Sequence, residues 1–181
     1  SDTLNQHRSN DTISRQIARH VLDNLVAVNP EDGSIHPWLA ESWEVSEDGL
    51  TYTFKLRQDV TFHDGTPFNA EAVKRNFDET MDPEKSPGFA YTAMGSSSYV
   101  GTEVIDEFTV QVTFNKPFAA FLLYLSDGGT GIDSPTALDA GGEDYGITSL
   151  VGSGPFKFVE WIQTDSVTLE KNPDYNWSSP A

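Results

Sequence analysis

Residues 39–57 read Leu39-Ala40-Glu41-Ser42-Trp43-Glu44-Val45-Ser46-Glu47-Asp48-Gly49-Leu50-Thr51-Tyr52-Thr53-Phe54-Lys55-Leu56-Arg57. Glu47-Asp48-Gly49 suits a tight hairpin turn, because glycine readily adopts the positive φ that such turns require. In the return strand Tyr52, Phe54 and Leu56 alternate with polar residues, so one face of that strand is apolar. The stretch therefore predicts a β-hairpin lying on a hydrophobic core, with Trp43 of the first strand also buried in it.

The segments around this hairpin alternate between helix and strand patterns. Helices are predicted where apolar residues recur on one face: Ile13, Ile17, Val21 and Leu25 after caps at 10–12; Ala70, Val73 and Phe77 after a cap at Asn69; a short helix after Pro117; and one opening at Ser134-Pro135. Strands are predicted at 60–62, at 108–114, and at 156–161 paired with 167–171. The fold class is α+β, a mixed β-sheet with interspersed helices.

The charge is strongly negative. The 181 residues hold 28 Asp and Glu against 11 Lys and Arg, a formal net charge of −17. Nucleic acids and anionic membranes bind through cationic side chains, so this balance excludes a nucleic-acid-binding function. Solubility or adaptation to salt explains the acidity better than an acidic cation site does.

The chain has no cysteine, which excludes a disulfide framework, a thiolate zinc site and a cysteine nucleophile. No apolar stretch approaches the roughly 18 residues of a membrane-spanning helix. The first residues, Ser1-Asp2-Thr3, are polar and lack the basic head and apolar core of a secretory signal. If the protein is exported, we expect its signal to have been removed.

Candidate catalytic and metal-binding residues are few. The four histidines, His7, His20, His36 and His63, are not spaced three to five residues apart, as helical metal ligands would be. His63-Asp64-Gly65 is interpreted as a turn. Gly152-Ser153-Gly154 is followed by Pro155 and a strand pattern, not by the helix that follows a nucleophile elbow. We predict no catalytic residues, no metal site, no cofactor and no enzymatic activity.

Residues 82–102 show no periodicity and are predicted to form a long loop, rich in Gly, Ser and Tyr. Long loops in compact domains often carry function, and Tyr with Ser and Gly suits adaptable recognition. Tyr91, Ser97 and Tyr99 are therefore candidate binding residues. The alternative is that the tyrosines only fasten the loop to the core.

Several motifs together resemble family 5 of the extracellular solute-binding proteins, in the right order along nearly the whole chain. They are Leu39-Ala40-Glu41-Ser42-Trp43, Ser46 to Arg57, Val60-Thr61-Phe62-His63-Asp64-Gly65-Thr66-Pro67-Phe68, Val151-Gly152-Ser153-Gly154-Pro155-Phe156 and Lys171-Asn172-Pro173-Asp174-Tyr175. The stretches 9–14 and 68–74 look most like the dipeptide and glutathione branch of that family.

The resemblance implies the N-terminal part of a two-lobed fold like that of the type II periplasmic binding proteins, with an extra subdomain. Residues 1–28 would begin the first lobe, 29–148 would form the extra subdomain, and 149–181 would return to the sheet of the first lobe. The second lobe, which carries the family's usual anchors for peptide termini, would be absent from this chain.

The resemblance also implies which segments approach the ligand cleft. The expected ligand-binding residues are Ser9, Asn10, Asp11 and Thr12 before the first helix, Tyr91, Ser97 and Tyr99 in the long loop, and Thr130 and Gly131 before Ser134-Pro135. Nickel-complex binders of the family carry an arginine in that last stretch, and Thr130-Gly131-Ile132 has none.

The function implied by the resemblance is the substrate-binding component of an ABC importer. It would capture a short peptide, such as a dipeptide, an oligopeptide or a glutathione-like molecule, outside the cytoplasm and deliver it to the permease subunits of the transporter. The protein would be a monomer, secreted or anchored by lipid to the cell surface. The alternatives are the same scaffold binding a nickel chelate or an oligosaccharide, or, in a different class, a hydrolase.

The net charge predicts that salt stabilises the fold. Self-repulsion among −17 charges is screened over about 10 Å at 0.1 M salt and about 3 Å at 1 M. We expect a higher melting midpoint in 1 M sodium chloride than in 20 mM, measured by circular dichroism. An equal or lower midpoint at high salt would show that the charges are already well paired.

Overall fold

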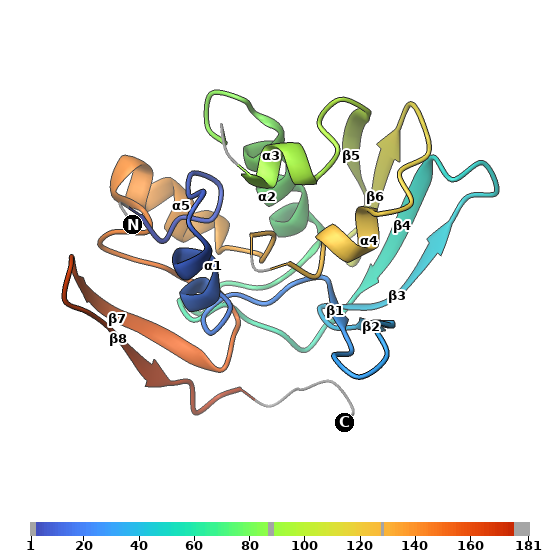
Figure 1. Ribbon diagram of the computed structural model, residues 1–181. Helices are drawn as coiled ribbons and strands as arrows, with labels where there is room; N and C mark the ends of the chain where they lie inside the picture. The colour runs from blue at the N-terminus through green and yellow to red at the C-terminus, as the bar shows by residue number, and fades with distance from the viewer. Residues whose placement is uncertain (1–2, 87–88, 128, 176–181) are drawn as a thin grey trace.

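The structure, a computed structural model, describes residues 3–86, 89–127 and 129–175 (Figure 1). Its helices are α1 (Thr12–Ala18), α2 (Ala70–Met81), α3 (Phe89–Ala93), α4 (Phe121–Tyr124), α5 (Pro135–Gly141) and the short 3-10 helix η1 (Gly142–Asp144). Its strands are β1 (Val26–Val28), β2 (Ile35–Pro37), β3 (Ala40–Val45), β4 (Thr51–Leu56), β5 (Tyr99–Asp106), β6 (Thr109–Phe114), β7 (Phe156–Ile162) and β8 (Ser166–Lys171). The α+β class is confirmed.

The largest sheet has four antiparallel strands in the order β3-β4-β6-β5. It contains the predicted hairpin, in which Trp43 of β3 pairs with Phe54 of β4 and Gly49 in the turn has φ +69°. Two smaller antiparallel sheets are the hairpins β1–β2 and β7–β8. The last of these confirms the hairpin predicted at the end of the sequence.

The main hydrophobic core lies between this sheet and α2. As predicted, Ala70, Val73 and Phe77 of α2 are buried, and the Asn69 side chain caps the helix by accepting from the Ala72 amide. The sheet contributes buried side chains at Tyr52, Phe54, Leu56, Val110, Val112 and Phe114. The helix ends at Met81, two residues before Pro83, because proline disfavours helical geometry in the residue that precedes it.

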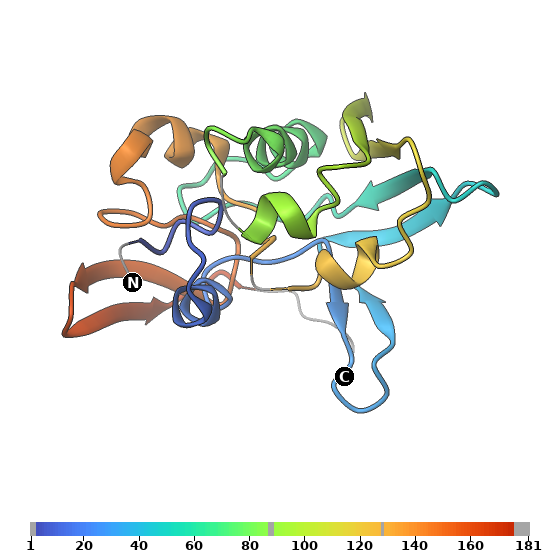
Figure 2. The same ribbon diagram turned by 45° about the horizontal axis from the view of Figure 1, so that its top comes forward.

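A second, smaller core joins the N-terminal segment to α5 and to the β7–β8 hairpin. Its buried members are Leu4, Ala18, Val21, Leu22, Leu138, Tyr145 and Leu150. Ile17 of α1 and Leu169 of β8 pack against it from the side. Figure 2 shows β7 and β8 on the side of the molecule occupied by α1 and α5, away from the four-stranded sheet.

The helix predicted around Ile13, Ile17, Val21 and Leu25 is shorter than expected. Asp11 caps it as predicted, but α1 ends at Ala18, and Val21 and Leu25 are buried outside it. Ile13 is 63% exposed. The helix stops because the carbonyl oxygens of residues 20 and 21 bond to the amides of residues 156 and 154, in a distant segment.

Two further predictions were wrong. The expected loop at 82–102 contains α3 and the first four residues of β5, an edge strand whose two register shifts disturb the alternation of its side chains. The expected strand at 60–62 forms only an isolated bridge between Thr61 and Pro67. There the backbone closes on itself, with the Phe62 amide bonded to the Thr66 carbonyl.

Trp43 is half-buried, not fully buried as predicted. It lies on β3, an edge strand of the sheet, and part of its indole remains exposed. Phe54, opposite it on the inner strand β4, is completely buried. The same apolar pattern therefore has different burial on the edge strand and on the inner strand.

The segment Gly152-Ser153-Gly154 passes directly against the chain at Val21. The Gly154 amide donates to the Val21 carbonyl at 2.9 Å. A Cβ on Gly152 would lie 2.3 Å from the Val21 oxygen, and one on Gly154 would lie 2.7 Å from the same atom. Any side chain at either position would therefore push the two segments apart.

Two other sequence motifs meet this segment. The backbone amide of His63 donates to the Gly152 carbonyl and its Nε2 donates to the Gly154 carbonyl, both at 2.8 Å. The backbone amide of Asn172 donates to the Pro155 carbonyl at 2.8 Å, and the side-chain Nδ2 of Asn172 donates to the Gly154 carbonyl at 3.2 Å. The turn prediction for His63-Asp64-Gly65 is confirmed, with Gly65 at φ +82°.

Asp23 is the buried acidic group at this junction. It is 4% exposed, and its carboxylate accepts from Trp38 Nε1 at 2.9 Å and from Ser153 Oγ at 2.8 Å. Burial raises the pKa of Asp23 to about 6, and the two hydrogen bonds, which favour the carboxylate, oppose that rise. Asp23 links the N-terminal segment to Trp38 and to the Gly-Ser-Gly segment.

We expect Phe54→Ala to cost roughly 3–5 kcal/mol of unfolding free energy, because it empties a fully buried aromatic site. Trp43→Ala should cost roughly 1–3 kcal/mol, since part of the indole is already in contact with water. Urea denaturation of both variants measures the difference. Equal losses would contradict the difference in burial between the two strands.

Asp23→Asn should flatten the pH dependence of stability between about pH 4 and pH 6. In that window native Asp23 holds a proton that the unfolded chain releases, so its contribution is complete at low pH and is lost as pH rises through 6. A pKa change from 3.8 to about 6 corresponds to about 3 kcal/mol. Between pH 4 and pH 7, the urea midpoint of the variant should therefore rise relative to that of the unmodified protein, as measured at pH 4, 5, 6 and 7.

The matched control is Asp144→Asn, at an exposed carboxylate on η1. This variant should keep the pH profile of the unmodified protein. If Asp23→Asn and Asp144→Asn gave the same profile, Asp23 would not titrate differently in the native and unfolded states.

Candidate functional site

The segment Ser9–Thr12 forms the turn that leads into α1. Ser9 is buried, and its Oγ accepts from the Asp11 amide at 3.1 Å. The Asp11 carboxylate accepts from the Ile13 amide at 3.0 Å and caps the helix. These two side chains shape the turn, whereas Asn10 and Thr12 are exposed.

Thr130 and Gly131 lie beside this N-terminal segment. The Gly131 amide donates to Gln6 Oε1 at 2.8 Å, and Gln6 Nε2 donates back to the Gly131 carbonyl. Thr130 is buried, with its hydroxyl donating to the Tyr124 carbonyl at the end of α4. The structure therefore joins Gly131 to Gln6, three residues before the predicted segment Ser9–Thr12.

The third predicted segment is only partly consistent with a binding role. Tyr91 is half-buried on α3, which lies between the N-terminal loop and α4 in both views (Figures 1 and 2). Ser97 is exposed in the turn before β5. Tyr99 starts β5, and its ring packs edge-on against Phe114 of the core. Its hydroxyl bonds to Thr102 at 2.7 Å, so Tyr99 has a structural role here.

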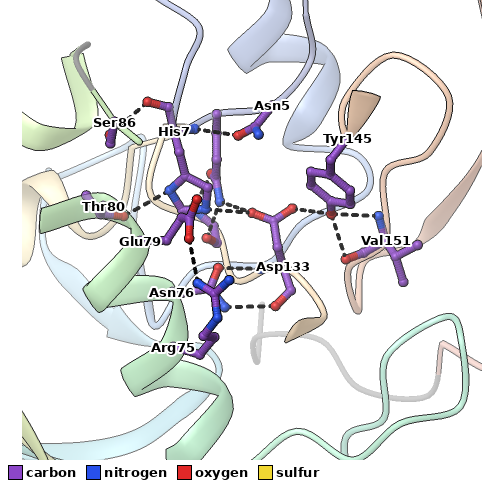
Figure 3. Close-up of polar contacts among 12 residues, drawn as sticks. Asn5, His7, Arg75, Asn76, Glu79, Thr80, Ser86, Asp133, Tyr145 and Val151 are labelled. Carbon is purple, nitrogen blue, oxygen red and sulfur yellow. Dashed lines mark hydrogen bonds and ion pairs between the residues drawn. The ribbon is translucent and has the colours of Figure 1, made fainter. Parts of the chain in front are cut away.

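A buried carboxylate, Asp133, holds the N-terminal segment in place (Figure 3). Its Oδ1 accepts from the Tyr145 hydroxyl at 2.6 Å. Its Oδ2 accepts from Gln6 Nε2 at 2.7 Å and lies 3.2 Å from His7 Nε2. Burial, and then the adjacent Asp133 charge, raise the pKa of Tyr145 well above its usual value, so this phenol stays a proton donor.

The backbone around this carboxylate is also fixed by side chains of α2. Asn76 donates to the Asp133 carbonyl at 2.8 Å and accepts from its amide at 2.9 Å. His7 Nδ1 lies 3.0 Å from Thr80 Oγ1, and Ser86 Oγ donates to the His7 carbonyl at 2.7 Å. The sequence analysis missed this cluster, because its members come from four segments far apart in the chain.

A cavity of about 590 Å³ opens between the segment that follows α1, strand β1 and helix α4. Its polar lining includes Arg19, Asp23, Asn24, Trp38, Ser126 and Asp127. Asn24 spans the cavity wall by donating to the carbonyls of Leu125 and Asp127. The sequence analysis named none of these residues as ligand-binding.

Within the described ranges, no three His, Asp or Glu side chains gather closely enough to hold a metal ion. Ser153, the serine of the Gly-Ser-Gly segment, is buried and donates its hydroxyl to Asp23. Of the helices in the part of the chain described, none has the length and apolar character needed to cross a membrane.

Comparison with known proteins identifies close relatives of this chain. Residues 34–181 match the family model described as bacterial extracellular solute-binding proteins, family 5 Middle. The glutathione-binding protein GsiB of Shigella flexneri is 40% identical over 173 residues, which cover 96% of this chain and 33% of GsiB. GsiB of Escherichia coli (strain K12) is 39% identical over the same length. The chain thus spans about a third of the length of the curated relatives it matches.

Solved structures share the fold. AgaA of A. tumefaciens R10, in complex with agropinic acid, has a TM-score of 0.84 at 35% identity over 96% of this chain and 34% of AgaA. DppA of Helicobacter pylori, in complex with the peptide STSA, has a TM-score of 0.83 at 32% identity over 96% of this chain and 37% of DppA. NikA of Brucella suis, in complex with Fe(III)-EDTA, has a TM-score of 0.83 at 32% identity over 99% of this chain and 35% of NikA. This chain belongs to family 5 of the bacterial extracellular solute-binding proteins.

Proposed function

We propose that this chain is part of the substrate-binding component of an ABC importer that captures short peptides outside the cytoplasm. The observation that carries the proposal is the match to glutathione-binding proteins over 96% of the chain, at 40% identity. A peptide-bound structure, that of DppA, shares the fold. The protein acts as a monomer and delivers its solute to the permease subunits.

The two hydrophobic cores support a division of the chain into a lobe and a subdomain. The smaller core joins the N-terminal segment to the β7–β8 hairpin, as expected for a first lobe built from residues 1–28 and 149–181. Most of the larger core, under the four-stranded sheet, comes from residues 29–148, with Leu25 and Val26 joining it from the preceding segment. Leu138 and Tyr145 pack with the smaller core, so the lobe also draws on α5 and the turn that follows it.

The geometry supports a ligand face formed by α1 and the segments beside it. The exposed Asn10 and Thr12 lie at the start of α1, and Gly131 is bonded to Gln6 of the segment that precedes this helix. In the relatives, peptide, agropinic acid and an EDTA chelate are the ligands named, and each carries carboxylate groups. A solute bridging this face and a second lobe would stabilise a closed form of the protein.

A nickel chelate is the second candidate solute, because NikA shares the fold. Gly131 argues against it. Residues 130–132 contain no arginine, and at Gly131 a Cβ would lie 2.7 Å from Leu22 Cβ, so this position has no room for one. An oligosaccharide ligand and a hydrolase activity have no supporting contact among the described residues.

The test is a thermal-shift screen of the natural protein at its full length against dipeptides, glutathione, nickel chelates and oligosaccharides. We expect dipeptides or glutathione to raise the melting midpoint, since a ligand at 100 times its Kd adds about 2.7 kcal/mol to native stability. Stabilisation by sugars or chelates alone would contradict the peptide assignment. Release of amino acids from the peptides would favour a hydrolase instead.

The 181-residue chain alone should bind the same peptides far more weakly. Its face supplies only one side of the proposed cleft, so most of the contacts that hold a peptide are missing. Calorimetry should show no saturation with any dipeptide at concentrations up to about a hundred times the full-length Kd. Micromolar binding to residues 1–181 would show that this face is a complete site by itself.

A further inference from the structure

A groove of about 640 Å³ runs between α1 and the β7–β8 hairpin, which lie side by side in both views (Figures 1 and 2). Helix α1 lines it with Ile13 and Ile17, and the hairpin lines it with Trp161, Val167 and Leu169. Among the described residues that line this groove none is a lysine or an arginine, and the one carboxylate is at position 165. The groove is therefore mainly an apolar surface.

This groove is the open side of the smaller hydrophobic core. Ile17, Trp161, Val167 and Leu169 line the groove and also pack against the buried members of that core. Each of these four side chains is only partly buried, so the core continues into the groove without being closed there. Ile13, which also lines the groove, is 63% exposed. Covering these side chains with other apolar groups would stabilise the fold, because it removes apolar surface from water.

The β7–β8 hairpin is also incomplete as a sheet. Within the described ranges its sheet has two strands, and neither has a further strand on its outer edge. Strand β7 leaves Val159 and Ile162 exposed in addition to the residues of the groove. A two-stranded hairpin is marginally stable in water unless further strands or a packed helix support it. The hairpin and the groove together therefore form a surface that more polypeptide would complete.

The relatives of this chain indicate where that polypeptide comes from. This chain spans 33% of GsiB and 34% of AgaA, so most of each relative lies outside the matched part. A second copy of the chain is a poor occupant, because two molecules of net charge −17 repel each other. An anionic membrane is disfavoured too, since the described lining of the groove offers no cationic side chain to attract it.

We propose that the groove between α1 and β7–β8 is an internal interface of the natural protein, covered by apolar side chains from a part of its chain outside residues 1–181. Covering the groove closes the smaller core and buries Ile13. It also holds α1 in place, and so fixes the turn that contains Asn10 before this helix. The groove is covered with or without a solute, so the proposal does not depend on the proposed function.

Cysteine labelling tests the interface, because residues 1–181 contain no cysteine. Ile13→Cys and Ser166→Cys place a thiol on each wall of the groove, on α1 and on β8. The matched controls are Val100→Cys on β5, at a side chain 62% exposed against 63% for Ile13, and Ser42→Cys on β3, which is exposed like Ser166. Each variant is made in the natural protein at its full length and in the 181-residue chain. All are labelled with a maleimide in the absence of solute, with unmodified protein as the blank.

In the full-length protein we expect the two groove thiols to react at least about tenfold more slowly than their controls, because the reagent must wait for the interface to open locally. In the 181-residue chain each groove thiol should react at the rate of its control. Circular dichroism identifies any variant that has lost its fold. Ser166→Cys exchanges a hydroxyl for a thiol at an exposed position, so it keeps the test valid if Ile13→Cys does not fold.

Two results would overturn the proposal. One is equal labelling rates for groove and control thiols in the full-length protein, which would show that the groove stays open there. The other is slow labelling of the groove thiols in the 181-residue chain, which would show that no further part of the natural chain is needed to cover them. A dependence of that slow labelling on protein concentration would then assign the groove to a second copy. Neither result bears on the proposed function, which fails only if peptides do not stabilise the full-length protein.

Discussion

The contact between the Gly-Ser-Gly segment and the backbone at Val21 is the constraint on which the rest of the structure depends. Two glycines without Cβ atoms let the chain approach closely enough for a 2.9 Å hydrogen bond from Gly154 to Val21. The Gly154 carbonyl of the same segment accepts hydrogen bonds from the side chains of His63 and Asn172. Motifs separated by more than a hundred residues therefore meet at one point, and steric exclusion explains why glycine is needed there.

This junction also sets the position of the candidate ligand face. It takes the carbonyl oxygens of residues 20 and 21 out of helical bonding, so α1 stops at Ala18. Asp23 is then held between Trp38 and Ser153, which fixes the wall of the cavity beside α4. On the other side of α1, Asp133 holds Gln6 and His7. A buried carboxylate that lost these donors would pay a large desolvation cost, so the N-terminal segment is firmly placed before any solute arrives.

The electrostatics of the chain give this rigid face its chemical character. Most cationic side chains pair with nearby carboxylates at the surface, as Lys74 does with Asp78 at 2.6 Å. Arg19, the residue that follows α1, instead lines the cavity beside α4 and donates to the Ser126 carbonyl.

The sequence by itself determined the family, the α+β class, the two hairpins and the caps of α1, α2 and α5. Those features depend on local patterns, such as Asp48-Gly49 at a turn or Asn69 before an apolar helix, and each acts within a few residues. That Ser9–Thr12 and Thr130–Gly131 approach one ligand cleft stays a prediction. The sequence could not show that α1 would stop at Ala18, that Trp43 would be half-exposed on an edge strand, or that Tyr99 would pack into the core. Only the tertiary structure decided these points, together with the Asp133 cluster and the cavity beside α4. Each of these features depends on which distant segment of the chain packs against it. Close backbone approach and the pairing of buried polar groups decide that packing, and neither produces a periodic pattern in the local sequence.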